Sequence, residues 1–191
     1  QLIPSRKVLG VDIETNGLDP FTGKLLSVAF SDGTDVWLYL NGLHDMGKIV
    51  SVLEDPSVLK VLQNAKFDLK WLKHHFGITV SNVFDTYLAE AVLCSGAVER
   101  EEEDEEGEVK THRVPLGLAD ILSRYGWMIS KEERKTFIDH SGFDVTPITN
   151  EQISYIMQDV IYLPALYHKQ LEKISKEGAA RALKLELAVL P

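Results

Sequence analysis

The chain has 191 residues, of which 45% are hydrophobic and 26% are charged. This length and balance fit one globular domain with a substantial core. No apolar stretch approaches the ~20 residues of a membrane-spanning helix, and the N-terminus lacks the pattern of a signal peptide. The single cysteine, Cys94, excludes an internal disulfide and fits a reducing compartment. We therefore expect a cytoplasmic, non-secreted protein with no membrane partner, and a sequence that is a piece of a longer one.

The net charge of −9 is unevenly distributed. Residues 99–110 contain eight acidic and two basic side chains, and without them 21 acidic and 18 basic residues remain, a net charge of −3. This balance argues against a tight, non-specific binder of duplex DNA, because such binding depends on many lysine and arginine contacts to phosphate. It does not exclude a protein that acts on a phosphate-bearing partner.

Hydrophobic periodicity and turn residues predict the elements of the first half of the chain. Strands are expected at residues 7–13, 24–30, 35–40 and 58–63. Helices are expected at residues 44–53, 64–75 and 85–94. Asn64 is a plausible N-cap for the second of these helices. Strands that come first and then alternate with helices indicate an α/β or α+β fold with a mixed sheet.

In the second half, residues 98–112 form an acidic segment without apolar periodicity, which predicts a solvated, flexible loop inserted into the domain. A short helix is expected from Leu116, ending near Gly126. A longer helix begins at a capping box of Thr149 and Gln152, and Pro164 should kink it.

Asp12 and Glu14 lie two residues apart at the end of the first expected strand. Residues i and i+2 of a strand point to the same face. Two buried carboxylates on one face are costly unless a metal ion, a cation or a shared proton compensates their charge. Their oxygen ligands suit Mg²⁺ or Mn²⁺. An isolated Asp-x-Glu pair is common, however, and does not define a metal site by itself.

Two further acids lie on expected helices. Asp159 follows Tyr155 by four residues, so both project from one helix face. Asp68 lies within the first two turns after Asn64. Taken alone, Asp159 is equally consistent with an exposed helix residue, and Asp68 with a residue that complements the helix dipole.

Together these residues resemble the three motifs of DnaQ-like 3′–5′ exonucleases of the DEDD superfamily. The matching segments, in the family's order and spacing, are Asp12-Ile13-Glu14, Asn64-x-x-Phe67-Asp68 and Tyr155-x-x-x-Asp159. The tyrosine resembles one subgroup, which includes the proofreading domains of family A DNA polymerases and the RNase D-like ribonucleases. The resemblance covers the chain except for the acidic segment.

The resemblance implies an RNase H-like α/β fold, with a mixed central sheet flanked by helices. It implies an exonuclease domain at residues 1–180, and residues 181–191 look like the start of a linker toward a polymerase domain. A monomeric protein of bacterial or phage-like origin is expected on the same basis.

The resemblance also implies two divalent metal ions, Mg²⁺ or Mn²⁺, held by Asp12, Glu14, Asp68 and Asp159. Such ions, ~3.5–4 Å apart, suit phosphodiester hydrolysis, and four carboxylates roughly balance their charge. Tyr155 would orient the attacking water. The residues expected to contact the 3′-terminal nucleotides are Leu18, Thr15, Asn64 and Phe67. Cations that could meet phosphates, although surface cations are usually only solvated, are Lys66, Lys70, Arg113, Lys131 and Lys135.

The main expectation is a proofreading domain of a family A DNA polymerase. It would hydrolyse the 3′ end of single-stranded or frayed DNA and release nucleoside 5′-monophosphates. Two alternatives are an RNase D-like RNA exonuclease and a catalytically silent domain with a structural or DNA-binding role. The four acids and the tyrosine argue against the silent domain.

Overall fold

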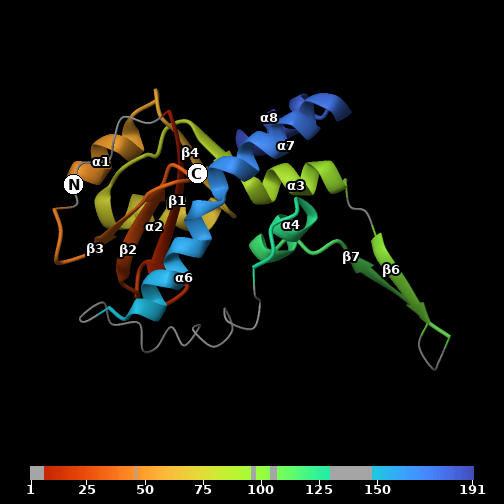
Figure 1. The fold of residues 1–191 in the computed structure, drawn as a ribbon, viewed down its shortest axis with the longest axis horizontal. Coiled ribbons are helices and arrows are strands. Elements are labelled where there is room, and N and C mark those ends of the chain that lie inside the picture. The colour runs from red at the N-terminus through yellow and green to blue at the C-terminus, as the bar shows by residue number, and fades with distance from the viewer. Residues whose placement is uncertain (1–6, 46, 96–97, 104–106, 130–147) are drawn as a thin grey trace.

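The computed structural model describes residues 7–45, 47–95, 98–103, 107–129 and 148–191. Its centre is a five-stranded sheet with the strand order β3-β2-β1-β4-β5 (Figure 1). The strands are β1 (Val8–Thr15), β2 (Leu25–Ser31), β3 (Val36–Leu40), β4 (Leu59–Leu62) and β5 (Val83–Asp85). The first three strands pair antiparallel, whereas β4 and β5 run parallel to β1. The expected mixed sheet is therefore confirmed.

Helices cover both faces of this sheet. The helices are α1 (Gly47–Glu54), α2 (Lys66–Phe76), α3 (Thr86–Cys94), α4 (Leu118–Arg124), α6 (Asn150–Ile161), α7 (Leu163–Glu177) and α8 (Ala180–Leu187). Apolar residues of α1 and α2 form one core with the sheet, and α6 and α7 contribute to two others. Figure 1 shows α6 crossing one face of the sheet. This is the RNase H-like arrangement that the sequence motifs imply.

The alternation of side chains along β1 separates the core from the candidate site. Leu9, Val11 and Ile13 are buried in the core that contains α1 and α2. Asp12 and Glu14 therefore point to the opposite face of the sheet. On that face, α6 packs against β1, β2 and β3. Because side chains alternate along β1, Asp12 and Glu14 lie on the face of the sheet that is covered by α6, the helix that carries the third motif.

Gly10 allows this helix to approach β1 closely. A Cβ atom at Gly10 would lie 2.5 Å from the backbone oxygen of Val160 and 2.9 Å from the Cβ of Leu163. Both distances are too short for a real contact, so the junction of α6 and α7 can lie against β1 only because this position has no side chain.

The helix start at Thr149 is confirmed in detail. The hydroxyl of Thr149 accepts a hydrogen bond from the backbone N–H of Gln152 at 3.2 Å, and the Gln152 side chain accepts one from the backbone N–H of Thr149 at 2.9 Å. The expected kink is a break between two helices, because α6 ends at Ile161 and Pro164 lies in the first turn of α7. The N–H groups in the first turn of a helix have no partner within the helix. Pro164, which lacks an N–H, therefore costs α7 no hydrogen bond.

The acidic segment does not form the expected loop. Instead, β6 (Val98–Glu103) and β7 (Val109–Arg113) pair antiparallel in a separate two-stranded sheet, which Figure 1 shows projecting from the body. In this register the acids at positions 101 and 102 lie opposite Thr111 and Lys110. Acidic positions therefore do not pair with one another in this register. That this segment is a flexible insertion stays a prediction.

The C-terminal residues pack against the domain. Helix α8 contacts α3 and β5, and its Leu183 is buried in the same core as residues of α3, α4 and α7. The expected linker at residues 181–191 therefore begins inside a helix that belongs to the domain's core. Within the described residues, no helix combines the length and apolarity required to cross a membrane.

Candidate active site

One pocket gathers every residue that the sequence motifs single out as catalytic or substrate-binding. Its volume is about 500 Å³, and it lies between β1, the start of α2 and α6. The nine predicted residues that line it are Asp12, Glu14, Thr15, Leu18, Asn64, Phe67, Asp68, Tyr155 and Asp159. Segments that lie far apart in the sequence thus form a single cavity.

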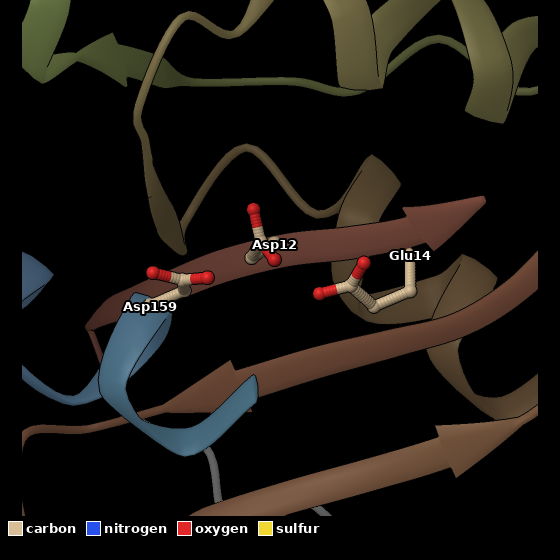
Figure 2. Close-up of side chains that lie close together, drawn as sticks. All are labelled: Asp12, Glu14 and Asp159. Atoms are coloured by element: carbon tan, nitrogen blue, oxygen red, sulfur yellow. The ribbon is translucent and has the colours of Figure 1, made fainter. Parts of the chain in front are cut away.

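Three of the acids form a compact carboxylate cluster. Asp12 and Glu14 lie on β1 and Asp159 on α6, with their side chains directed toward one another (Figure 2). One oxygen from each carboxylate lies within 4.8 Å of the others. Glu14 and Asp159 are buried, with 6% and 7% of their surface exposed, and Asp12 is half-buried. The cluster offers only hard oxygen donors, which is the ligand set that Mg²⁺ and Mn²⁺ prefer.

Asp68 lies in the same pocket but outside this group of three. It belongs to the first turn of α2 and is 4% exposed. Burial, followed by the nearby Asp12 carboxylate, raises the pKa of Asp68 well above its usual value. Asp68 is therefore close enough to Asp12 to feel its charge. A bound cation would compensate these acids, so the four carboxylates fit a divalent metal site.

The turn before α2 differs from the expected N-cap. Asn64 does not cap the helix; its backbone has a positive φ of 59°, and the cap position is Ala65, without a side-chain hydrogen bond. Asparagine and aspartate tolerate this left-handed conformation better than most other residue types. The prediction that Asn64 caps this helix was wrong.

Asp85 supplies the missing acceptors for this turn. Its carboxylate accepts hydrogen bonds from the backbone N–H groups of Asn64 and Ala65, at 3.0 and 2.9 Å. It also accepts from Tyr87 and Leu88 and so caps α3. Burial raises the pKa of Asp85, and its backbone hydrogen bonds oppose this rise. One carboxylate thereby fixes the segment that brings Phe67 and Asp68 to the pocket.

Gln63 and Leu118 also line the pocket, and a buried polar network holds α4, which begins at Leu118. Glu90, 1% exposed, pairs with Arg124 at 3.0 Å and accepts hydrogen bonds from Tyr125 and Gln170, both at 2.9 Å. This network joins α3, α4 and α7. The sequence motifs did not predict Gln63 or Leu118 at the site, because both residues are common types without a distinctive local pattern.

The remaining predicted residues lie outside this pocket. Lys66 and Lys70 are exposed on α2, and Arg113 is exposed at the end of β7. Lys131 and Lys135 lie outside the described residues.

The fold and the carboxylate cluster together define a nuclease of the DEDD type. Consistent with this, the model of the 3′–5′ exonuclease family matches residues 2–175, and the chain belongs to that family. Among characterised proteins it is 25% identical to human exosome complex component 10, over 93% of this chain and 18% of that protein. It is 29% identical to ribonuclease D of Gluconacetobacter diazotrophicus, over 76% of this chain and 32% of that protein. The chain thus spans about a fifth to a third of these relatives.

Solved structures share this fold. The structure of Brucella melitensis NrnC with bound Mg²⁺ matches with a TM-score of 0.75 and 25% identity, over 98% of this chain and 83% of that one. The same protein bound to pGG matches with a TM-score of 0.78 and 24% identity, over 98% and 82% of the two chains.

These relatives are not polymerase proofreading domains and so do not support that expectation, and one of them is a ribonuclease D. The three motifs could not make this distinction, because by resemblance both branches of the tyrosine subgroup share them. Residues 181–187 of the segment expected to begin a polymerase linker belong to helix α8.

Proposed function

We propose that this chain is a metal-dependent 3′–5′ exoribonuclease, which removes nucleoside 5′-monophosphates from the 3′ end of single-stranded RNA. The observation that carries this proposal is the cluster of Asp12, Glu14 and Asp159, with Asp68 in the same pocket. Ribonuclease D among the relatives supports RNA over DNA.

The carboxylates divide into two overlapping groups that would hold two divalent ions, Mg²⁺ or Mn²⁺. Asp12, Glu14 and Asp159 form the first group. Asp12 and Asp68 line the same pocket, and we assign them to the second group. When bound, a pair of such ions activates a water and stabilises the charge on the leaving oxygen.

The other pocket residues orient water and substrate. Tyr155 lies one helical turn before Asp159 and lines the pocket. With a reference pKa of about 10 it is a poor base, so we assign it the positioning of the attacking water through its hydroxyl. Leu18 is 88% exposed at the pocket and is placed to contact the terminal base. Thr15, Asn64 and Phe67 frame the same end of the substrate.

The test uses matched RNA and DNA oligonucleotides with a 5′ label, with Mg²⁺ and with EDTA. We expect a ladder of products shortened from the 3′ end, a preference for RNA, and no reaction in EDTA. Asp12→Ala and Asp159→Asn should each lower kcat at least a hundredfold. The matched control is Asp35→Asn, an exposed carboxylate in the turn between β2 and β3, which should keep full activity.

Three outcomes would contradict the proposal. A strong preference for DNA would remove the RNA assignment. Activity that survives in Asp12→Ala and Asp159→Asn would place the active site elsewhere. A folded parent that binds metal but releases no nucleotide would favour the silent domain.

A further inference from the structure

A groove adjoins the active-site pocket and continues along α2. Its volume is about 770 Å³, and it shares Leu18, Asn64 and Phe67 with the pocket. None of the four pocket carboxylates lines it. The groove is therefore a separate space that a substrate can enter while its scissile bond lies at the acids.

The wall of this groove opposite α2 is the loop between β1 and β2, and two contacts hold this loop in place. The Asn16 side chain accepts a hydrogen bond from the backbone N–H of Lys24 at 2.6 Å, which closes the loop. Gly23 lies against Trp71 of α2, where a Cβ would be 2.5 Å from the indole ring. The loop is thus held directly on α2 at a contact that admits no side chain at Gly23.

This loop presents apolar side chains to solvent. Leu18 and Phe21 are 88% and 79% exposed, and both line the groove. The ring of Phe21 meets His74 of α2 edge-on, with 4.7 Å between centroids. Exposed aromatic rings along a channel are the usual stacking partners of single-stranded nucleic acid, because every base offers a π-face.

The α2 wall carries positive charge that no described residue pairs. Lys66 and Lys70 are exposed, line the groove and are one helical turn apart, so they lie on the same face. Neither forms an ion pair with any described residue. Lys73 differs from them, since its Nζ donates to Thr79 at 2.9 Å. Asp19 also lines the groove, and its carboxylate accepts hydrogen bonds from the backbone N–H of Phe21 and from the hydroxyl of Thr22.

The position of these cations indicates the direction in which a substrate strand would run along the groove. In a 3′–5′ exonuclease the scissile phosphate lies at the metal-binding acids, and every other phosphate of the substrate lies on its 5′ side. We propose that the groove binds the nucleotides 5′ of the cleaved bond, with Lys66 and Lys70 contacting a phosphate and the Phe21–His74 pair a base. This proposal rests on the proposed function and names the part of the RNA that the groove selects.

The test compares variants on three ribonucleotide substrates: a dinucleotide without a 5′ phosphate, the same dinucleotide with one, and an eight-residue oligonucleotide. The double variant Lys66→Ala/Lys70→Ala should raise KM about tenfold for the two substrates that carry a phosphate beyond the scissile one, with kcat within about twofold. It should leave the unphosphorylated dinucleotide unchanged. Phe21→Ala should raise KM about tenfold for all three, because each has a base on the 5′ side.

The salt dependence provides a second measurement on the oligonucleotide. Loss of two phosphate contacts should reduce the slope of log KM against log salt concentration by about 1.4, at ~0.7 for each contact on a single strand. The matched control is Lys169→Ala/Lys173→Ala, which removes the same charge from an exposed pair one turn apart on α7. This control should change neither KM nor the slope.

The outcomes separate the two proposals. Unchanged KM and salt slope in both groove variants, with an active parent, would overturn the groove assignment and leave the exonuclease intact. A parent that cleaves DNA but not RNA would contradict the proposed function, and the same comparison on DNA substrates would then test the groove. With a parent that cleaves neither, fluorescence polarisation of labelled RNA in EDTA decides, and equal affinity of parent and variants would overturn the groove assignment.

Discussion

At the scale of single residues, Lys60 links burial to pH. Its side chain is fully buried in β4, and its Nζ donates to the backbone oxygen of Asp55 at 2.7 Å. Burial lowers the pKa of Lys60 to about 8, and the Asp55 carboxylate opposes this. Between pH 8 and the unfolded pKa of about 10.4, the unfolded chain binds more protons. The free energy of unfolding should therefore rise with pH in this window, by at most about 1.4 kcal/mol per pH unit from this residue.

Urea denaturation at pH 7.5, 8.5, 9.5 and 10 measures this contribution. Lys60→Met keeps an unbranched apolar stem and removes the titrating group. Because all other groups titrate in both proteins, the parent should gain stability relative to Lys60→Met as the pH rises. A difference between the two proteins that stays constant over this range would show that Lys60 keeps an ordinary pKa.

The residue scale also shows what local sequence patterns can predict. Asp12, Glu14, Asp68 and Asp159 share a pocket as expected, because strand alternation and helix spacing fix the direction of neighbouring side chains. The role of Asp85 was not predicted. It satisfies the backbone of Asn64, 21 residues earlier, and no local pattern connects two such distant positions.

At the scale of elements, the approach of α6 to β1 depends on Gly10. A Cβ at this position would clash with the backbone oxygen of Val160. Gly10→Ala should therefore push α6 away from β1 and separate Asp159 from Asp12. We expect a loss of about 1–3 kcal/mol in stability. We also expect a fall of at least tenfold in kcat, since even a shift of about 1 Å in a catalytic group can cost about a hundredfold. Thermal unfolding and single-turnover rates measure the two effects.

Gly178→Ala is the control for Gly10→Ala, because it should lower stability without moving Asp159. Gly178 ends α7 with a φ of +68°, and a Cβ there would meet no atom within 4 Å. The alanine should cost about 1–2 kcal/mol through its left-handed backbone alone and leave kcat unchanged. If Gly10→Ala behaved in the same way, the close contact at β1 would not position Asp159.

The elements themselves were largely predictable where the apolar pattern is long. The capped helix at Thr149 and the strands of the first half lie close to their expected positions. The three-residue strand β5 was missed because it is too short to show a period. The hairpin of β6 and β7 was missed because β6 is rich in glutamate, a residue depleted in strands.

At the scale of the whole molecule, the site concentrates negative charge that the fold must tolerate. The oxygens of Asp12, Glu14 and Asp159 lie within 4.8 Å of one another, and burial raises the pKa of Asp68. Arrangements of this kind cost stability in the absence of a compensating cation. Binding of a divalent cation at this cluster should therefore be coupled to folding, because the unfolded chain does not hold the acids together.

This coupling predicts that Mg²⁺ raises the Tm, and that the rise depends on the acids of the cluster. Saturation with Mg²⁺ at about 100 times its Kd should stabilise the fold by about 2.7 kcal/mol, which raises the Tm by roughly 5–10 °C over that in EDTA for a domain of this size. Asp12→Asn removes one charge of the cluster, so it should lose this rise while its Tm in EDTA stays at or above that of the parent. Asp35→Asn, which removes an exposed charge outside the pocket, should keep the full rise. Equal Mg²⁺ responses in all three proteins would show that Mg²⁺ stabilises the fold at some site other than the carboxylate cluster.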